Sequence, residues 1–148
     1  MNISNKSYRE IKVIAIECYK RYRTRNPFII FEKLGIGYNV IELKGNLAGF
    51  TSECHTSAIN EEYPFFVYIN SRYDSYSQKI IAAHELGHIL LHKGDDLNML
   101  EESDSSYIKE YEANIFAMEF MPQIQPHDKK YISLSPSELQ EYICSKLI

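Results

Sequence analysis

The stretch IIAAHELGHILLH, residues 80–92, constrains the fold of this chain more than any other segment. It places three of the five histidines four residues apart among apolar side chains: His84, His88 and His92. Residues with this spacing lie on one face of an α-helix, one turn above another. A polar group buried there without a partner costs stability. The segment therefore predicts a buried helix whose histidine face has a specific use.

Two of these histidines have the spacing of a metal-binding pair. His84 and His88 can direct two imidazole nitrogens at one ion, about 2 Å from each nitrogen. Glu85 is rotated by roughly 100 degrees around the helix, so it flanks the ion without binding it. This H-E-x-x-H arrangement predicts two zinc ligands and a glutamate that takes a proton from the attacking water. The alternative is a buried histidine pair held only by hydrogen bonds.

Two further residues, His92 and Gly87, are unusual inside an apolar helix. His92 lies about 12 Å along the helix axis from His84, too far to share an ion with both other histidines. We expect it to support a ligand through a hydrogen bond or to have a structural role. Gly87 costs about 1 kcal/mol relative to alanine in a helix interior. It indicates that a backbone, a substrate or the sheet packs close by.

A catalytic zinc ion needs a third protein ligand and an open position. The best candidate is Glu110, 22 residues beyond His88 in the segment KEYEANIFAMEFMP. Asn114 shares its helical face, so we expect Glu110 to bind the metal and Asn114 to hydrogen-bond a ligand. Glu112 points away from that face and is the alternative ligand if the helix starts elsewhere.

Cys54 is a rival third ligand, because peptide deformylases combine a histidine helix with an upstream cysteine. The motifs around both elements differ here.

The chain has three widely spaced cysteines and no apolar leader, which favours a reduced, cytoplasmic protein. No apolar run approaches the roughly 20 residues that cross a bilayer.

The remaining patterns predict an α+β fold with a small antiparallel sheet between the first helices and the histidine helix, and no domain boundary, hence a single domain over 1–148. Helices are expected over about 7–23, 27–34, 75–93, 107–121 and 136–147. Ser105 or Ser106 is the expected cap of the fourth helix. Strands are expected over 38–44, 48–53 and 64–70, with a Gly45-Asn46 turn that predicts an antiparallel hairpin between the first two. Ser75, with Gln78 three residues later, is the expected cap of the histidine helix. Pro122 should end the fourth helix, and Ser135 with Glu138 should cap the last.

Charge is unevenly distributed along the chain. Residues 1–33 carry a net charge of +5, whereas the whole chain carries −4. A basic first helix can contact nucleic acid or an acidic partner, but a solvated helix face explains it more simply. We therefore expect no direct nucleic-acid binding.

The two motifs together resemble the ImmA/IrrE family of zinc metallopeptidases. Its pattern is HExxH followed, one helix later, by E-x-x-A-N-x-F-A and a proline. The matching segments here are HELGHILLH at 84–92 and EYEANIFAMEFMP at 110–122. The resemblance extends over about residues 10–122 in element order and is specific over the two motifs.

The resemblance implies a gluzincin-like minimal metalloprotease domain with one zinc ion on His84, His88 and Glu110, and with Glu85 as general base. It also implies a cytoplasmic endopeptidase that cleaves a helix-turn-helix repressor of a mobile element, prophage or stress regulon. Larger members continue beyond the final short helix, so we expect no separate sensor or DNA-binding domain here. The competing hypothesis is a non-catalytic zinc-containing module that sequesters a repressor or antitoxin-like partner. The intact Glu85 argues against it, because a structural zinc site needs no base.

Three features bear on the substrate. If the segment PFFVYINSRYD is an edge strand, it can pair with an extended peptide; if it is interior, its apolar run is core. The acidic segment 94–105 is either a lid or a solvated connector. Tyr73, Tyr76 and Tyr107 are near enough to the motifs to donate to a developing oxyanion.

Overall fold

The computed structural model describes residues 6–54, 62–93, 104–128 and 130–148. Its helices are α1 (Tyr8–Tyr22), α2 (Pro27–Leu34), α3 (Ser75–His92), α4 (Asp104–Phe120) and α5 (Pro136–Ser145). Its strands are β1 (Gly37–Ile41), β2 (Gly49–Glu53) and β3 (Phe65–Asn70), and two 3-10 turns, Pro122–Ile124 and Tyr131–Ser133, precede α5. None of the described helices is long and apolar enough to cross a membrane.

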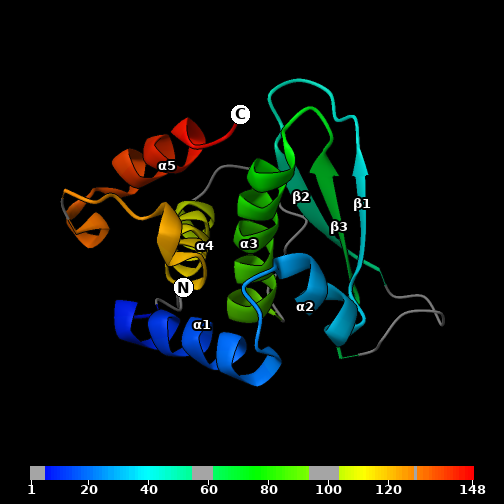
Figure 1. Ribbon diagram of the computed structural model, residues 1–148, viewed down its shortest axis with the longest axis horizontal. Coiled ribbons are helices and arrows are strands. Elements are labelled where there is room, and N and C mark those ends of the chain that lie inside the picture. The colour runs from blue at the N-terminus through cyan, green and yellow to red at the C-terminus, as the bar shows by residue number, and fades with distance from the viewer. Residues whose placement is uncertain (1–5, 55–61, 94–103, 129) are drawn as a thin grey trace.

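The histidine helix α3 occupies the middle of the molecule (Figure 1). It contacts β2 and β3 on one side, α4 on another and α2 as well. Apolar residues surround its axis, and Ile80, Ala83, Leu86 and Ile89 are fully buried. A helix that is apolar on most of its faces needs neighbours on all of them. This packing places the histidines inside the protein.

The sheet is mixed, with the strand order β1-β3-β2. β1 pairs with β3 in parallel and β2 pairs with β3 antiparallel. The α+β class is confirmed, but the hairpin between the first two strands and the wholly antiparallel sheet are wrong. The most apolar strand, β3, takes the centre because Phe65, Val67 and Ile69 are buried. The segment 64–70 is thus interior, and β2 is an edge strand.

Three helix boundaries test the predicted caps. The side chain of Asp74 accepts from the Ser77 backbone N–H, so α3 is capped one residue before the expected Ser75. α4 begins at Asp104, before the serines expected to cap it, and ends before Pro122 as predicted. The capping box of Ser135 and Glu138 is confirmed. Gly94 and most of the acidic segment lie outside the described residues.

Gly87 marks the close approach of α3 to α4. A Cβ atom at this position would lie 3.0 Å from the Cβ of Phe116 and 3.1 Å from its ring. The neighbour that excludes a side chain is therefore on α4 and not on the sheet. Because α4 lies so close, its polar side chains reach the histidine face of α3.

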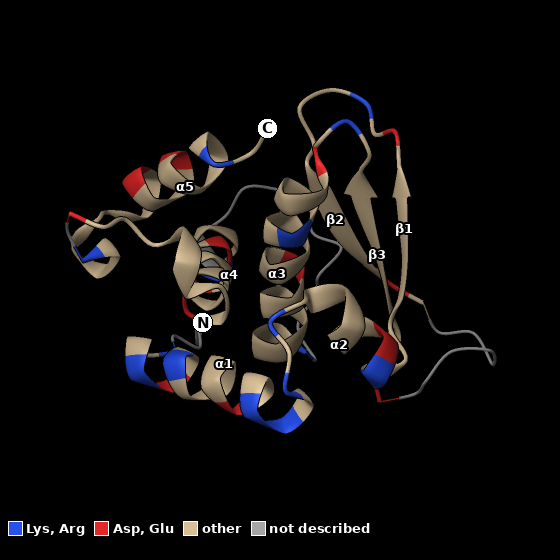
Figure 2. Cartoon of the chain, viewed as in Figure 1, with Lys and Arg blue, Asp and Glu red and all other residues tan. Residues whose placement is uncertain are grey.

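Basic residues are concentrated on α1 and the turn that follows it (Figure 2). Arg9, Lys12, Lys20, Arg21 and Arg23 are exposed to solvent. α1 packs against α4 through its opposite face, which contains Ile11 and Ala15. The basic residues of α1 thus form a solvated helix face.

Candidate metal centre

Three side chains from α3 and α4 converge on one point. His84 Nε2 lies 3.0 Å from Glu110 Oε2, and His88 Nε2 lies 2.9 Å from Glu110 Oε1. The two Nε2 atoms are 3.2 Å apart. One ligand atom from each of the three residues falls within 4.8 Å of the others, and this is the one such group among the residues that the structure describes. Two imidazoles and a carboxylate are a donor set that zinc accepts in catalytic sites.

The ring of His84 is fixed from behind by α4. Its Nδ1 lies 2.7 Å from Asn114 Oδ1, and Asn114 Nδ2 donates to Gln140 Oε1 at 2.7 Å. Because the amide oxygen only accepts, Nδ1 of His84 donates in this contact, which leaves Nε2 as the nitrogen that faces the common point. The chain from Gln140 on α5 through Asn114 thus directs Nε2 at the common point.

The ring of His88 is held by a second pair of residues. Its Nδ1 lies 3.2 Å from Nδ1 of His92, whose Nε2 lies 2.9 Å from Glu112 Oε1. Both His92 and Glu112 are 3% exposed. His92 therefore lies next to His88, with its other ring nitrogen facing Glu112.

The two rival third ligands lie elsewhere. Both carboxylate oxygens of Glu112 have partners, because Oε2 accepts from the backbone N–H of Lys6 at 2.5 Å while Oε1 faces His92. Cys54 follows the end of β2, where its backbone N–H donates to Pro64 O. Neither residue belongs to the group of converging donors. The geometry therefore favours Glu110 over both.

Glu85 lies beside the histidine pair and is oriented by the sheet. Its Oε2 accepts a 2.7 Å hydrogen bond from the hydroxyl of Thr51 on β2. Both side chains are buried, but Glu85 still lines the same cleft as His84 and Glu110. One oxygen of the carboxylate is thus held while the other is available to a molecule in the cleft.

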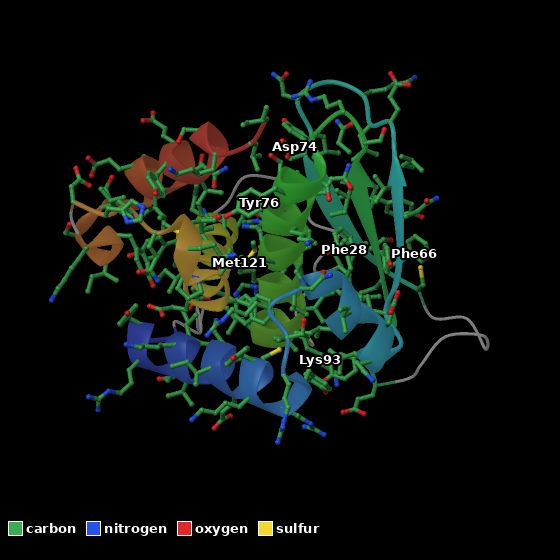
Figure 3. All side chains as sticks on the ribbon, in the orientation of Figure 1. Phe28, Phe66, Asp74, Tyr76, Lys93 and Met121 are labelled. Carbon is green, nitrogen blue, oxygen red and sulfur yellow. The ribbon has the colours of Figure 1, made fainter. Side chains whose placement is uncertain are left out.

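The cleft has a volume of about 570 Å³ and is bounded by four parts of the chain. Residues 46–49, which lead into β2, form one wall, and α5 with the residues after it forms the opposite wall. The floor consists of residues before and within α3 and of Glu110 and Asn114 on α4. In Figure 3, Asp74 and Lys93 mark the two ends of α3. Apolar residues line both walls: Leu47, Ala48, Ile143 and Leu147. A cleft of this size and lining suits a peptide segment with an aliphatic side chain.

The three tyrosines named above differ in position. Tyr73 lines the cleft, and its hydroxyl accepts from the Arg72 guanidinium at 2.7 Å. Tyr76 and Tyr107 are 46% and 59% exposed at the surface. Of the three, Tyr73 alone has a place next to a bound substrate.

The charges of the converging side chains shift one another's pKa values. Burial alone would lower the pKa of His84, but the charge and hydrogen bond of Glu110 raise it to about 9. Desolvation opposes ionisation of Glu110, but His84 and His88 hold the pKa of its carboxyl far below the usual range. Burial lowers the pKa of His92, which favours its neutral ring. The ionised carboxylate of Glu110 therefore favours a positive charge at the point where the three side chains meet.

Two residues of the site were not predicted from the sequence. Thr51 lies on a strand more than thirty residues before Glu85, and Gln140 lies on α5, 26 residues after Asn114. Neither belongs to a motif with local spacing. The signal that identifies them is the fold, which brings β2 and α5 to opposite sides of α3 and α4.

The chain matches known proteins over this same region. The model of the Peptidase_M78 family, described as the IrrE N-terminal-like domain, matches residues 37–139, more than two thirds of the chain. The match contains β2, α3 and α4 entire. A protein described as "Uncharacterized immunity region protein 2" of Bacillus phage phi105 is 27% identical over 124 residues, which cover 82% of this chain and 74% of that protein.

Proposed function

This chain belongs to the Peptidase_M78 family of IrrE N-terminal-like domains, a metallopeptidase family, and on that basis we propose that it is a zinc-dependent endopeptidase. The observation that carries the proposal is the convergence of His84, His88 and Glu110 beside a buried glutamate in a peptide-sized cleft. A purely structural zinc site would have no need of Glu85 and would complete its coordination with a fourth protein ligand.

The residues that would hold the zinc ion are His84 and His88 through Nε2 and Glu110 through its carboxylate. The hydrogen bonds at Nδ1 of both histidines support this assignment, because they leave Nε2 for the metal. When bound, zinc supplies Lewis-acid chemistry that lowers the pKa of the attacking water and polarises the scissile carbonyl.

Glu85 is the proposed general base. The Thr51 hydroxyl occupies Oε2, so Oε1 would receive the proton of the attacking water. The same carboxyl would then pass that proton to the nitrogen of the leaving amine, which restores the base.

The substrate would bind as an extended segment along β2. Among the described strands, β2 pairs along one edge only, whereas β3 pairs along both edges. Gly49, the first residue of β2, and the residues just before it line the cleft that contains the donor group. Backbone pairing to this edge would place a peptide bond over the metal position while the apolar walls take its side chains. This role falls to β2 because β3 is interior.

The proposed substrate is a helix-turn-helix repressor in the cytoplasm. The resemblance to ImmA/IrrE peptidases supports it, and so does a relative that bears the name of a phage immunity region. Cleavage would derepress the mobile element, prophage or stress regulon that the repressor controls.

The experiment combines the purified protein with the repressor encoded beside its gene, with and without a zinc chelator, and measures intact masses. We expect two fragments whose masses add up to the repressor plus one water, and none after chelation. An intact repressor in a stable complex with the protein would contradict the proposal and favour the sequestering module.

A further inference from the structure

The buried pair of Glu112 and His92 takes no part in the proton transfers proposed above. These residues lie on different helices, α4 and α3, and each is 3% exposed. A carboxylate at this depth is costly unless all of its oxygens are hydrogen-bonded. The backbone N–H of Lys6 and the ring of His92 meet that need.

The chemistry of the donors fixes the direction of each hydrogen bond. The Glu112 carboxylate can only accept, so the proton between it and His92 lies on His92 Nε2, 2.9 Å away. A neutral imidazole has one N–H, so His92 Nδ1 carries a lone pair. That lone pair faces His88 Nδ1 at 3.2 Å, which must then donate. A His88 ring that donates from Nδ1 has its own lone pair on Nε2.

We propose that Glu112 and His92 are a positioning pair for the metal centre: they hold His88 with its proton on Nδ1 and its Nε2 lone pair directed at the point shared with His84 and Glu110. The inference rests on the proposed zinc site. It gives His88 a support equivalent to the one that Asn114 gives His84. It also explains why a glutamate two positions from Glu110 is buried rather than solvated.

The first test measures zinc affinity by competition with a chromophoric chelator, using Glu112→Gln. Loss of the charged acceptor should weaken zinc binding roughly 10- to 100-fold, the range for partners behind metal-binding histidines. The matched control is Glu119→Gln, which makes the same change on the same helix. Glu119 accepts from Tyr8 and Tyr131 and is not part of the metal site. Zinc affinity that stays unchanged in folded Glu112→Gln would overturn the proposal.

The second test needs no variant, so it stands even if Glu112→Gln fails to fold. In the zinc-loaded wild-type protein, ¹⁵N NMR of the histidine rings should show the His92 proton on Nε2 and a scalar coupling between the Nδ1 atoms of His88 and His92. A His92 proton on Nδ1 would overturn the positioning role.

Both readouts are separate from cleavage. Zinc binding with these NMR signatures but without hydrolysis of the repressor would contradict the peptidase proposal and leave the positioning pair supported. A wild-type protein that binds no zinc would overturn both.

Discussion

The hydroxyl of Thr51 donates a 2.7 Å hydrogen bond to Oε2 of Glu85, and both side chains are buried. This contact joins an edge strand of the sheet to the central helix. It holds the carboxylate beside the histidine pair in one orientation, which is the kind of preorganisation that positions a catalytic base.

Thr51→Val should therefore slow cleavage while zinc remains bound. Valine keeps the shape of threonine but cannot donate, and hydrogen bonds to charged groups contribute about 1.5–3 kcal/mol. A fall in kcat of roughly tenfold or more is expected, since about 1.4 kcal/mol corresponds to a factor of ten. The control is Ser52→Ala, because neighbouring residues of a strand point to opposite faces. An unchanged kcat in Thr51→Val would show that the contact does not orient the base.

Asn114→Leu should weaken zinc binding. The substitution keeps the approximate volume of a buried residue but removes the acceptor that holds the His84 ring. Loss of such a partner lowers metal affinity by roughly 10- to 100-fold. Gln140→Ala should have a smaller effect, because Gln140 reaches His84 only through Asn114. Isothermal titration or chelator competition measures the zinc affinity of both variants. Equal affinities in the wild-type protein and the two variants would show that Asn114 does not support His84 as a ligand.

Zinc affinity should rise with pH. In the metal-free protein the pKa of His84 is about 9, so zinc must displace a proton from it at neutral pH. The apparent association constant should increase by roughly tenfold per pH unit up to about 9 and then level off. Titrations in the presence of a competing chelator of known pH dependence test this. A flat profile would mean that His84 is already neutral.

The same shift affects the stability of the metal-free protein. The folded pKa of His84 lies above the reference value of 6.5. Its contribution to the free energy of unfolding is therefore complete below pH 6.5 and is lost as the pH rises through about 9. Urea unfolding of the chelated protein across this range should show the decline, and His84→Asn should remove this part of it.

Gly87→Ala should destabilise the fold. The added methyl group would meet Cβ of Phe116 at 3.0 Å, and that atom cannot move without its backbone. Overpacking of this kind costs about 1–3 kcal/mol, against about 1 kcal/mol gained in helix propensity. We expect a net loss of roughly 1 kcal/mol in the free energy of unfolding, measured by chemical denaturation. A more stable variant would show that α4 can shift away from α3.

Local patterns predicted much of this molecule. The helix that contains His84, the capping box at Ser135 and the end of α4 before Pro122 all depend on residues near in sequence, and the structure has them. The convergence of Glu110 with the histidines also follows from local spacing, once α4 is known to lie against α3.

Non-local relationships were not predicted. A Gly45 turn between two strands suggests a hairpin, and nothing near the turn indicates that β3 will insert between them. The contact of Thr51 with Glu85 depends on that insertion, because it needs β2 on the edge that faces α3. Glu112 looked like a residue turned away from the site, and only the packing of α4 shows that it reaches His92.

The most direct test of the central claim is the Glu85→Gln variant, assayed for zinc content and repressor cleavage in the same sample. The three proposed ligands remain in this variant, whereas the group that takes the proton is gone. We predict about one zinc ion per chain, as in the wild-type protein, and no repressor fragments. Cleavage at the wild-type rate by zinc-loaded Glu85→Gln would contradict the account.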